Sequence, residues 1–170
     1  MSKSTPSRPP IGQATRTFHI VASRFNAQYV DGLIDHVTEE LRALVPRGTI
    51  LLHRVPGSFE IPVIARELAI QNKADAIIAC GVILQGETDH AQNLSRSVTH
   101  ALQRIAIEHG VPVINAVLTF HNENQAQARC LENEINRGIE AARAAVEIAN
   151  VLSKIRNKQG AVSKPPRDNG

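Results

Sequence analysis

The chain has 170 residues, 42% of them hydrophobic and 21% charged, which fits one soluble domain with a sizeable core and argues against a second domain. Its formal net charge is only +3, and with one Tyr, four Phe and no Trp it offers few rings for stacking bases, so we expect no nucleic-acid partner. No apolar run approaches the length of a membrane span and the first ten residues lack the apolar centre of a secretory signal, so we expect a cytoplasmic protein with no membrane partner.

The two cysteines, Cys80 and Cys130, are too few for a disulfide framework and lack the spacing of metal ligands. We interpret both as small, buried side chains and predict no metal site.

The first elements follow a lead-in without periodicity. Residues 1–15 are rich in Ser, Thr, Pro and Gly, so we predict a flexible N-terminal segment. A strand is predicted over 17–23. From Ala27, apolar residues recur at three- and four-residue intervals, which predicts a helix that Pro46 closes.

The central part of the chain repeats the alternation of strand and helix. A second strand over 49–55 stops at Pro56, and a helix over 59–70 follows, with Pro62 where a first-turn proline is tolerated. A third strand over 75–82 is continuously apolar, as expected when both faces of a sheet are covered.

The last elements are a helix over 93–108, a strand over 111–118 and one long helix over about 124–155. The basic stretch 156–170 has too little apolar content to pack, and we predict a disordered tail. The folded domain is therefore predicted to span 16–155.

This order of elements predicts an α/β fold, a single-domain three-layer α/β/α sandwich around a central four-stranded parallel sheet with right-handed crossovers. The N-terminal segment is a candidate for a further strand, added to the sheet of a neighbouring subunit.

Unusual residues follow the predicted strands, in the turns 24–26, 56–60, 86–90 and 119–122. Because the carboxyl ends of parallel strands meet at one edge, these turns are expected to converge on a ligand site. There, Phe25 could stack a planar ring, Glu60 could bind hydroxyls, and His90 could transfer a proton near neutral pH.

Each of these residues also has an ordinary structural interpretation. An aromatic residue such as Phe25 more often packs than binds a ligand, and a lone histidine such as His90 is more often solvated. Glu60 could simply complement a helix dipole, and Thr88 or Asp89 could be a helix N-cap. The residues alone indicate a small-molecule site of undefined chemistry.

Five segments resemble, in order and spacing, the signatures of the 6,7-dimethyl-8-ribityllumazine synthase family, and together they cover about residues 17–153. They are SRFN (23–26), VPGSFEIP (55–62), GVILQGETDH (81–90), GVPVINAVLT (110–119) and GIEAARAAVEIANVL (138–152). No single segment is decisive, but the second and third at this separation are specific.

The resemblance implies a flavodoxin-like fold and a transferase of riboflavin biosynthesis. Such an enzyme condenses 5-amino-6-(D-ribitylamino)uracil with 3,4-dihydroxy-2-butanone 4-phosphate, releases phosphate and water, and uses neither a metal nor an organic cofactor. It performs the penultimate step of that pathway, which implies a functional link to riboflavin synthase.

The resemblance also assigns roles to individual residues. His90 would be catalytic, as a proton relay. The pyrimidine ring and ribityl chain would be held by Phe25, Ser58, Phe59, Glu60, Val82, Ile83 and Asn115. The phosphate would be held by Gly86, Glu87, Thr88 and Arg129, with Arg137 in a supporting position.

The chain departs from the family's pattern at three places. Asn115 stands where an aromatic residue from the neighbouring subunit usually closes the pocket, and Ala91-Gln92 replaces the usual aromatic-acidic pair. The glycine- and lysine-rich turn usual near 130–137 is absent, which favours a continuous helix there. In the family that turn is associated with icosahedral shells. Because this chain lacks it, we expect a homopentamer or a dimer of pentamers, with active sites at subunit interfaces.

Three other interpretations compete with this one. A catalytically weak relative that only binds flavin or lumazine would need neither His90 nor Arg129. A phosphate-binding module of flavodoxin type would carry a loop rich in Ser, Thr and Gly after its first strand, which SRFNAQ is not. A purely structural shell protein would not need such a density of polar groups at its strand ends.

Overall fold

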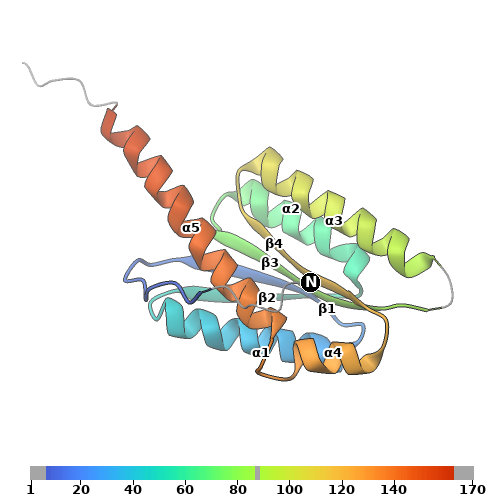
Figure 1. Cartoon of the computed structure of the whole chain (residues 1–170). Helices are drawn as coiled ribbons and strands as arrows, with labels where there is room; N and C mark the ends of the chain where they lie inside the picture. The colour runs from blue at the N-terminus through green and yellow to red at the C-terminus, as the bar shows by residue number, and fades with distance from the viewer. Residues whose placement is uncertain (1–6, 87–88, 163–170) are drawn as a thin grey trace, which may run out of the picture.

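The computed structural model describes residues 7–86 and 89–162. Its four strands form one parallel sheet in the order β2-β1-β3-β4 (Figure 1). The strands are β1 (Thr17–Ser23), β2 (Thr49–Val55), β3 (Ala76–Leu84) and β4 (Val113–Phe120). The helices are α1 (Ala27–Leu44), α2 (Ile61–Gln71), α3 (His90–His109), α4 (Glu123–Cys130) and α5 (Arg137–Val162), with a short 3₁₀ turn, η1 (Ser58–Glu60), before α2.

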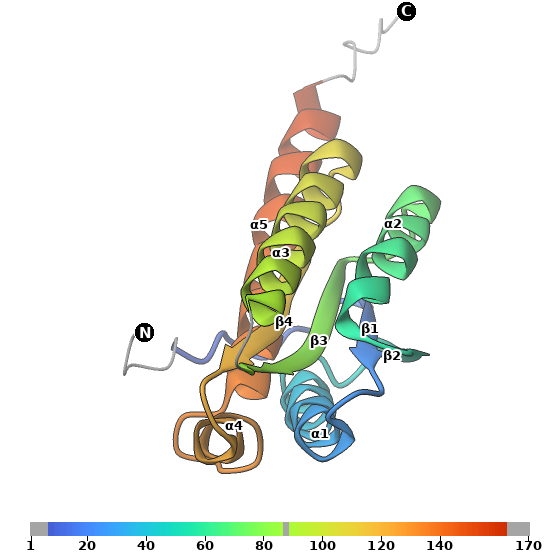
Figure 2. The same cartoon turned by 90° about the vertical axis from the view of Figure 1, so that its right-hand side faces the viewer.

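Helices cover both faces of the sheet, as the alternation of elements predicts. Viewed along the sheet, α1 lies below it, and α2 and α3 lie above it (Figure 2). One core cluster joins α1, α5 and the sheet, and a second joins α2, α3 and the opposite face. Central strand β3 is buried along almost its whole length, because it receives side chains from both clusters. The predicted three-layer α/β/α sandwich is confirmed.

The predicted bounds of β1 and β2 are confirmed, whereas the later elements are shifted. β3 and β4 both continue two positions beyond the predicted ends, to Leu84 and Phe120, and they pair with each other in register up to those residues. Helix α3 begins at His90 rather than at residue 93.

The prediction of one continuous helix over 124–155 is wrong. The chain leaves the helix after Cys130 and begins another at Arg137. Asn136, which is 1% exposed, starts the second helix: its Oδ1 accepts from the Gly138 N–H at 2.8 Å, and its Nδ2 donates to the Glu132 carbonyl at 2.8 Å.

Close packing against α1 explains why the chain breaks here. A Cβ at Gly32 would lie 2.7 Å from the Cys130 carbonyl oxygen, and a Cβ at Gly138 would lie 2.7 Å from the Leu33 carbonyl oxygen. Both segments therefore approach α1 backbone to backbone, and α4 and α5 reach it only as separate helices.

The two ends of the chain are more structured than predicted. Residues 7–15 form no helix or strand, but they contact α1: the Gly12 N–H donates to the Leu44 carbonyl at 2.8 Å, and Arg8 forms an ion pair with Glu40. The prediction of disorder from residue 156 is wrong for 156–162, which continue α5 beyond the edge of the sheet (Figure 1). Residues 1–6 and 163–170 lie outside the described residues.

Both cysteines are buried and free, as predicted. Burial raises the pKa of each thiol to about 12, so Cys80 and Cys130 are protonated fillers of the core. Within residues 7–86 and 89–162, no helix combines the length and apolar character needed to cross a membrane.

Two histidines on neighbouring strands form a pair that no pattern in the sequence predicts. His19 on β1 and His53 on β2 stack with ring centroids 5.2 Å apart, and their Nδ1 and Nε2 atoms are 2.9 Å apart. His19 is 8% exposed. Burial, and to a smaller extent the charge of His53, lowers the pKa of His19 below its ordinary value of 6.5.

Because the folded state disfavours the protonated form of His19, we expect this histidine to make stability depend on pH. The folded state is favoured by the neutral form of His19, and this contribution to the free energy of unfolding is fully present above pH 6.5, the pKa in the unfolded chain. It is lost as the pH falls from 6.5 through the lower pKa of the folded state. Free energies of unfolding from denaturant titrations across this interval should fall less steeply for His19→Gln than for the unaltered protein. His100→Gln, at an exposed position on α3, is the control and should keep the original slope. Equal slopes in all three proteins would contradict the assignment.

Candidate active site

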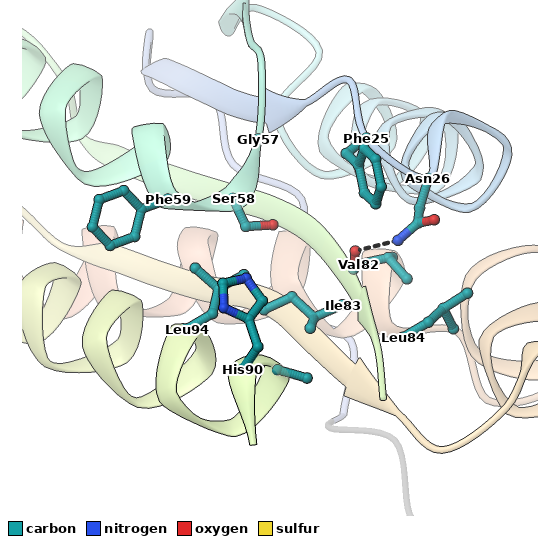
Figure 3. A pocket seen from close by; sticks show the side chains of 11 residues that line it. Phe25, Asn26, Gly57, Ser58, Phe59, Val82, Ile83, Leu84, His90 and Leu94 are labelled. Atoms are coloured by element: carbon teal, nitrogen blue, oxygen red, sulfur yellow. Dashed lines mark hydrogen bonds between the residues drawn. The ribbon is translucent and has the colours of Figure 1, made fainter. Parts of the chain in front are cut away.

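A pocket of about 700 Å³ opens at the carboxyl edge of the sheet (Figure 3). It lies between the loop after β1, the turn η1, the end of β3 and the start of α3, where the ends of parallel strands are expected to form a site. Its lining residues are Phe25, Asn26, Gly57, Ser58, Phe59, Val82, Ile83, Leu84, His90, Ala91 and Leu94.

Two aromatic rings stand on opposite sides of this pocket in Figure 3: Phe59, from η1, at the left, and Phe25, from the loop after β1, at the right. Phe25 is 72% exposed and Phe59 is 63% exposed, although both lie beside apolar neighbours. Rings left this open gain from burial against a planar partner, which offers a large apolar area and a favourable stacking geometry. The sequence singled out both residues.

Ser58 brings the turn η1 close to the central strand. The side chain is 6% exposed, and a Cβ at Gly81 on β3 would lie 2.6 Å from the Ser58 Oγ. A Cβ at position 81 would therefore require the Ser58 side chain to move, so glycine there favours this close approach of the turn to the strand. Ser58 and its two neighbours form one wall of the pocket.

Glu60 makes a hydrogen bond within the turn before α2, a contact different from the helix-dipole role that its position also allows. Its Oε2 accepts a hydrogen bond from the Gly57 N–H at 2.8 Å, which closes the turn before α2. Glu60 is exposed and does not line the pocket itself, but it shapes the turn that presents Ser58 and Phe59.

Asn26 lines the pocket and was not among the predicted site residues. Its Nδ2 donates a hydrogen bond to the Val82 carbonyl at 2.8 Å, shown as a dashed line in Figure 3. An Asn just before a helix normally signals an N-cap, and Asn26 occupies that position in α1 without making a side-chain cap bond. The sequence position of Asn26 therefore suggests a helix cap, whereas its side chain bonds to the Val82 carbonyl instead.

His90 is the first residue of α3 and is exposed at the mouth of the pocket. In Figure 3 its imidazole points from the helix start toward the space between Ser58 and Ile83. Gly86 is exposed, and a Cβ there would meet nothing within 4 Å. Glu87 and Thr88, predicted phosphate ligands, lie outside the described residues.

Arg129 does not reach this pocket within one chain. It lies on α4 and lines a separate, polar hollow of about 450 Å³ beside Asn122, Gln125 and Glu132. Its Nη1 is buried and has no hydrogen-bond partner among the described residues. A permanently charged donor left in this state is free to bind an anion.

Two further predicted residues also lie away from the pocket. Asn115, on edge strand β4, donates to the Thr99 Oγ1 at 3.1 Å and accepts from the Val117 N–H at 3.0 Å, so both ends of its amide are engaged. Arg137 forms an ion pair with Glu140 at the start of α5. Within one chain, the apolar pocket residues and His90 therefore lie together, whereas Arg129 and Asn115 lie outside the pocket.

Candidate metal ligands are dispersed over the described part of the chain, where no three His, Cys, Asp or Glu side chains gather closely enough to hold an ion.

Comparison with known protein families gives one match over most of the chain. Residues 15–153 match the family described as 6,7-dimethyl-8-ribityllumazine synthase. The matched range contains every residue of the pocket and also Arg129.

Individual relatives carry the same description. The chain is 43% identical over 142 residues to a 6,7-dimethyl-8-ribityllumazine synthase of Paraburkholderia phymatum, covering 83% of this chain and 80% of that one. It is 41% identical over 134 residues to one of Azoarcus sp. (78% and 83% covered) and 44% identical over 133 residues to one of Burkholderia multivorans (78% and 75% covered).

Proposed function

The chain belongs to the 6,7-dimethyl-8-ribityllumazine synthase family, and we propose that the pocket at its strand ends carries out that family's condensation. The enzyme joins 5-amino-6-(D-ribitylamino)uracil to 3,4-dihydroxy-2-butanone 4-phosphate and releases phosphate and water, in the penultimate step of riboflavin biosynthesis. The observation that carries the placement is the convergence of Phe25, Phe59 and His90 on one pocket of about 700 Å³.

In this proposal the pyrimidine ring stacks on Phe25 and lies along the end of β3, near Val82 and Ile83. The loop around Ser58 and Phe59 holds the ribityl chain through its backbone groups. Stacking and backbone contacts together orient the 5-amino group toward the second substrate, and fixing two reactants in this way lowers the entropic part of the barrier.

His90 supplies the proton transfers. The amine attacks the ketone of the second substrate, water leaves as the imine forms, and phosphate is eliminated. The ribitylamino nitrogen then attacks the remaining carbonyl, and the ring closes as a second water leaves. Each of these steps moves a proton, and an imidazole can both accept and donate one.

The phosphate site is proposed to be completed by a second subunit. The buried, unpartnered Nη1 of Arg129 supports a role as anion ligand, but this arginine lies outside the pocket of its own chain. We therefore propose a homo-oligomer, a pentamer or a dimer of pentamers, in which Arg129 and Asn115 of one subunit complete the pocket of the next. In this assembly the N-terminal segment would add a strand to a neighbouring sheet, with Arg137 supporting the interface and residues 86–88 contacting the phosphate.

We further propose that the protein works in the cytoplasm and delivers its product to a riboflavin synthase. A phosphorylated substrate supports this location, since its charges make unassisted transfer across a bilayer very costly.

The function is tested by mixing the purified protein with both substrates and following the absorbance and fluorescence of the lumazine product. We expect formation well above the spontaneous rate, which is measured without protein and with unfolded protein. Product binding without acceleration would replace the enzyme by the alternative, a relative that only binds flavin or lumazine.

A further inference from the structure

The central strand is longer than its neighbour on one side. The pairing of β1 with β3 ends at Ala22 and Cys80, whereas the pairing of β3 with β4 continues to Leu84 and Phe120. Residues 81–84 of β3 therefore have a strand partner only on the β4 side. On the other side they form an open ledge, and the last three of these residues line the pocket.

Asn26 occupies part of the space that a longer β1 would fill. Its side-chain amide donates to the Val82 carbonyl at 2.8 Å, so it supplies a donor to β3 two residues beyond Cys80, the last residue of β3 that pairs with β1. A buried strand carbonyl is normally paired in this way by backbone.

The backbone of Asn26 adopts a conformation suited to this contact. Its φ of 55° and ψ of 44° are left-handed, a region that Asn enters more readily than most residues. The side chain makes no cap bond to α1, and this leaves its amide available for Val82.

The same loop is also fixed on its other side. The Arg24 N–H donates to the Val55 carbonyl at 2.8 Å, and the Phe25 N–H donates to the Pro56 carbonyl at 3.2 Å. Phe25, which is 72% exposed, has little packing of its own to hold its ring in place. Its position therefore depends on these backbone bonds and on the amide of Asn26.

We propose that Asn26 is a positioning residue for the part of the pocket between Phe25 and β3, where the pyrimidine ring is proposed to bind. By tying the loop to the Val82 carbonyl, Asn26 sets the distance between the Phe25 ring and the ledge of β3. The inference rests on the proposed function, since it assumes that a planar ring occupies this part of the pocket. Asn26 acts through Phe25 and Val82 rather than on the reacting atoms.

The decisive variant is Asn26→Gly, because glycine tolerates both the left-handed backbone and the N-cap position while removing the amide. The matched control is Asn72→Gly. Asn72 is the other described non-glycine residue with a positive φ, 50°, and it ends α2 outside the pocket lining. Asn26→Asp is the second variant, since its carboxylate keeps the size of the side chain but cannot donate to Val82.

Each protein is titrated with 6,7-dimethyl-8-ribityllumazine, and the steady-state constants for both substrates are measured. We expect Asn26→Gly and Asn26→Asp to weaken lumazine binding and raise the KM for the pyrimidine substrate by about tenfold, as the loss of one well-placed hydrogen bond implies. In both Asn26 variants, the KM for the phosphorylated substrate should stay within about twofold of the original value. In Asn72→Gly, the lumazine affinity and both KM values should stay within about twofold of the original values.

Unchanged lumazine affinity in a folded Asn26→Gly or Asn26→Asp protein would overturn the proposal. An equal rise of KM for both substrates, or the same loss in Asn72→Gly, would also overturn it, because either result indicates a general loss of structure. Failure of the proposed function gives a different result: the original protein would then bind lumazine without accelerating its formation, and the affinity comparison would still decide the role of Asn26.

Discussion

Replacing Arg129 by alanine is expected to raise the KM for 3,4-dihydroxy-2-butanone 4-phosphate by about 30-fold or more, with a smaller change in the KM for the pyrimidine substrate. Removing one partner of a buried, hydrogen-bonded charge pair typically costs about 2 kcal/mol or more, which corresponds to that factor. The buried Nη1 has no partner among the described residues, so its hydrogen-bonding capacity is left for an anion. Steady-state kinetics with each substrate varied in turn measure the effect.

Two further variants test whether the geometry and the position of the Arg129 charge both matter. Arg129→Lys keeps the charge but loses the planar fork, so it should recover only part of the affinity. Arg104→Ala, on the exposed face of α3 where Arg104 pairs with Glu108 at 3.4 Å, is the control and should leave both KM values unchanged. An unaltered KM for the phosphorylated substrate in Arg129→Ala would refute the phosphate assignment.

Replacing His90 by alanine is expected to lower kcat by about two to four orders of magnitude and to leave a slow but measurable enzyme. General acid–base catalysis by a positioned side chain typically contributes that much. The remaining rate comes from holding the two substrates together, which does not require the imidazole. Part of the pH dependence of kcat should be lost in the variant, because the proposed acid–base group has been removed.

The control for His90 lies on the same helix. His100 is exposed on α3 and outside the pocket, so His100→Ala should retain full activity and the original pH profile. If His90→Ala turned over within about twofold of the original rate, another group would have to move the protons, and the proton-relay assignment would be withdrawn.

The architecture could be predicted from the sequence because its signals are local. The apolar runs at 17–23 and 49–55 coincide with β1 and β2, and the second run is followed by Pro56, which cannot donate a ladder hydrogen bond. Convergence of the turns follows from the rule that parallel strands end at one edge, and the turns that carry Phe25, Phe59 and His90 do meet at one pocket.

The break between α4 and α5 could not be predicted in the same way. Residues 131–136 contain no glycine or proline, and local propensity therefore favours a continuous helix. What ends α4 is the close approach of two segments to α1, at Gly32 and Gly138, and a buried Asn136 that caps the next helix. These are contacts between residues far apart in the chain, and tertiary packing overrides propensity here.

The finer features of the site depend on register rather than on residue type. The pairing of His19 with His53 and the contact of Ser58 with Gly81 appear only once the strands are aligned. The amide of Asn26 is a similar case, because it meets Val82 only since β1 ends before β3 does. Sequence patterns locate strands to within a few residues, and that precision is too coarse to reveal such contacts.

The ledge of β3 also bears on how this site can change by mutation. If the backbone of residues 82–84 recognises the ring, the identity of the side chains there carries little of the specificity. Exchanges among Val, Ile and Leu could then accumulate over generations without loss of the substrate, whereas a proline or a one-residue deletion would remove or misplace the contact at once. Binding of the ring would thus tolerate exchanges among similar apolar side chains at 82–84, but it would be lost when the backbone itself is changed.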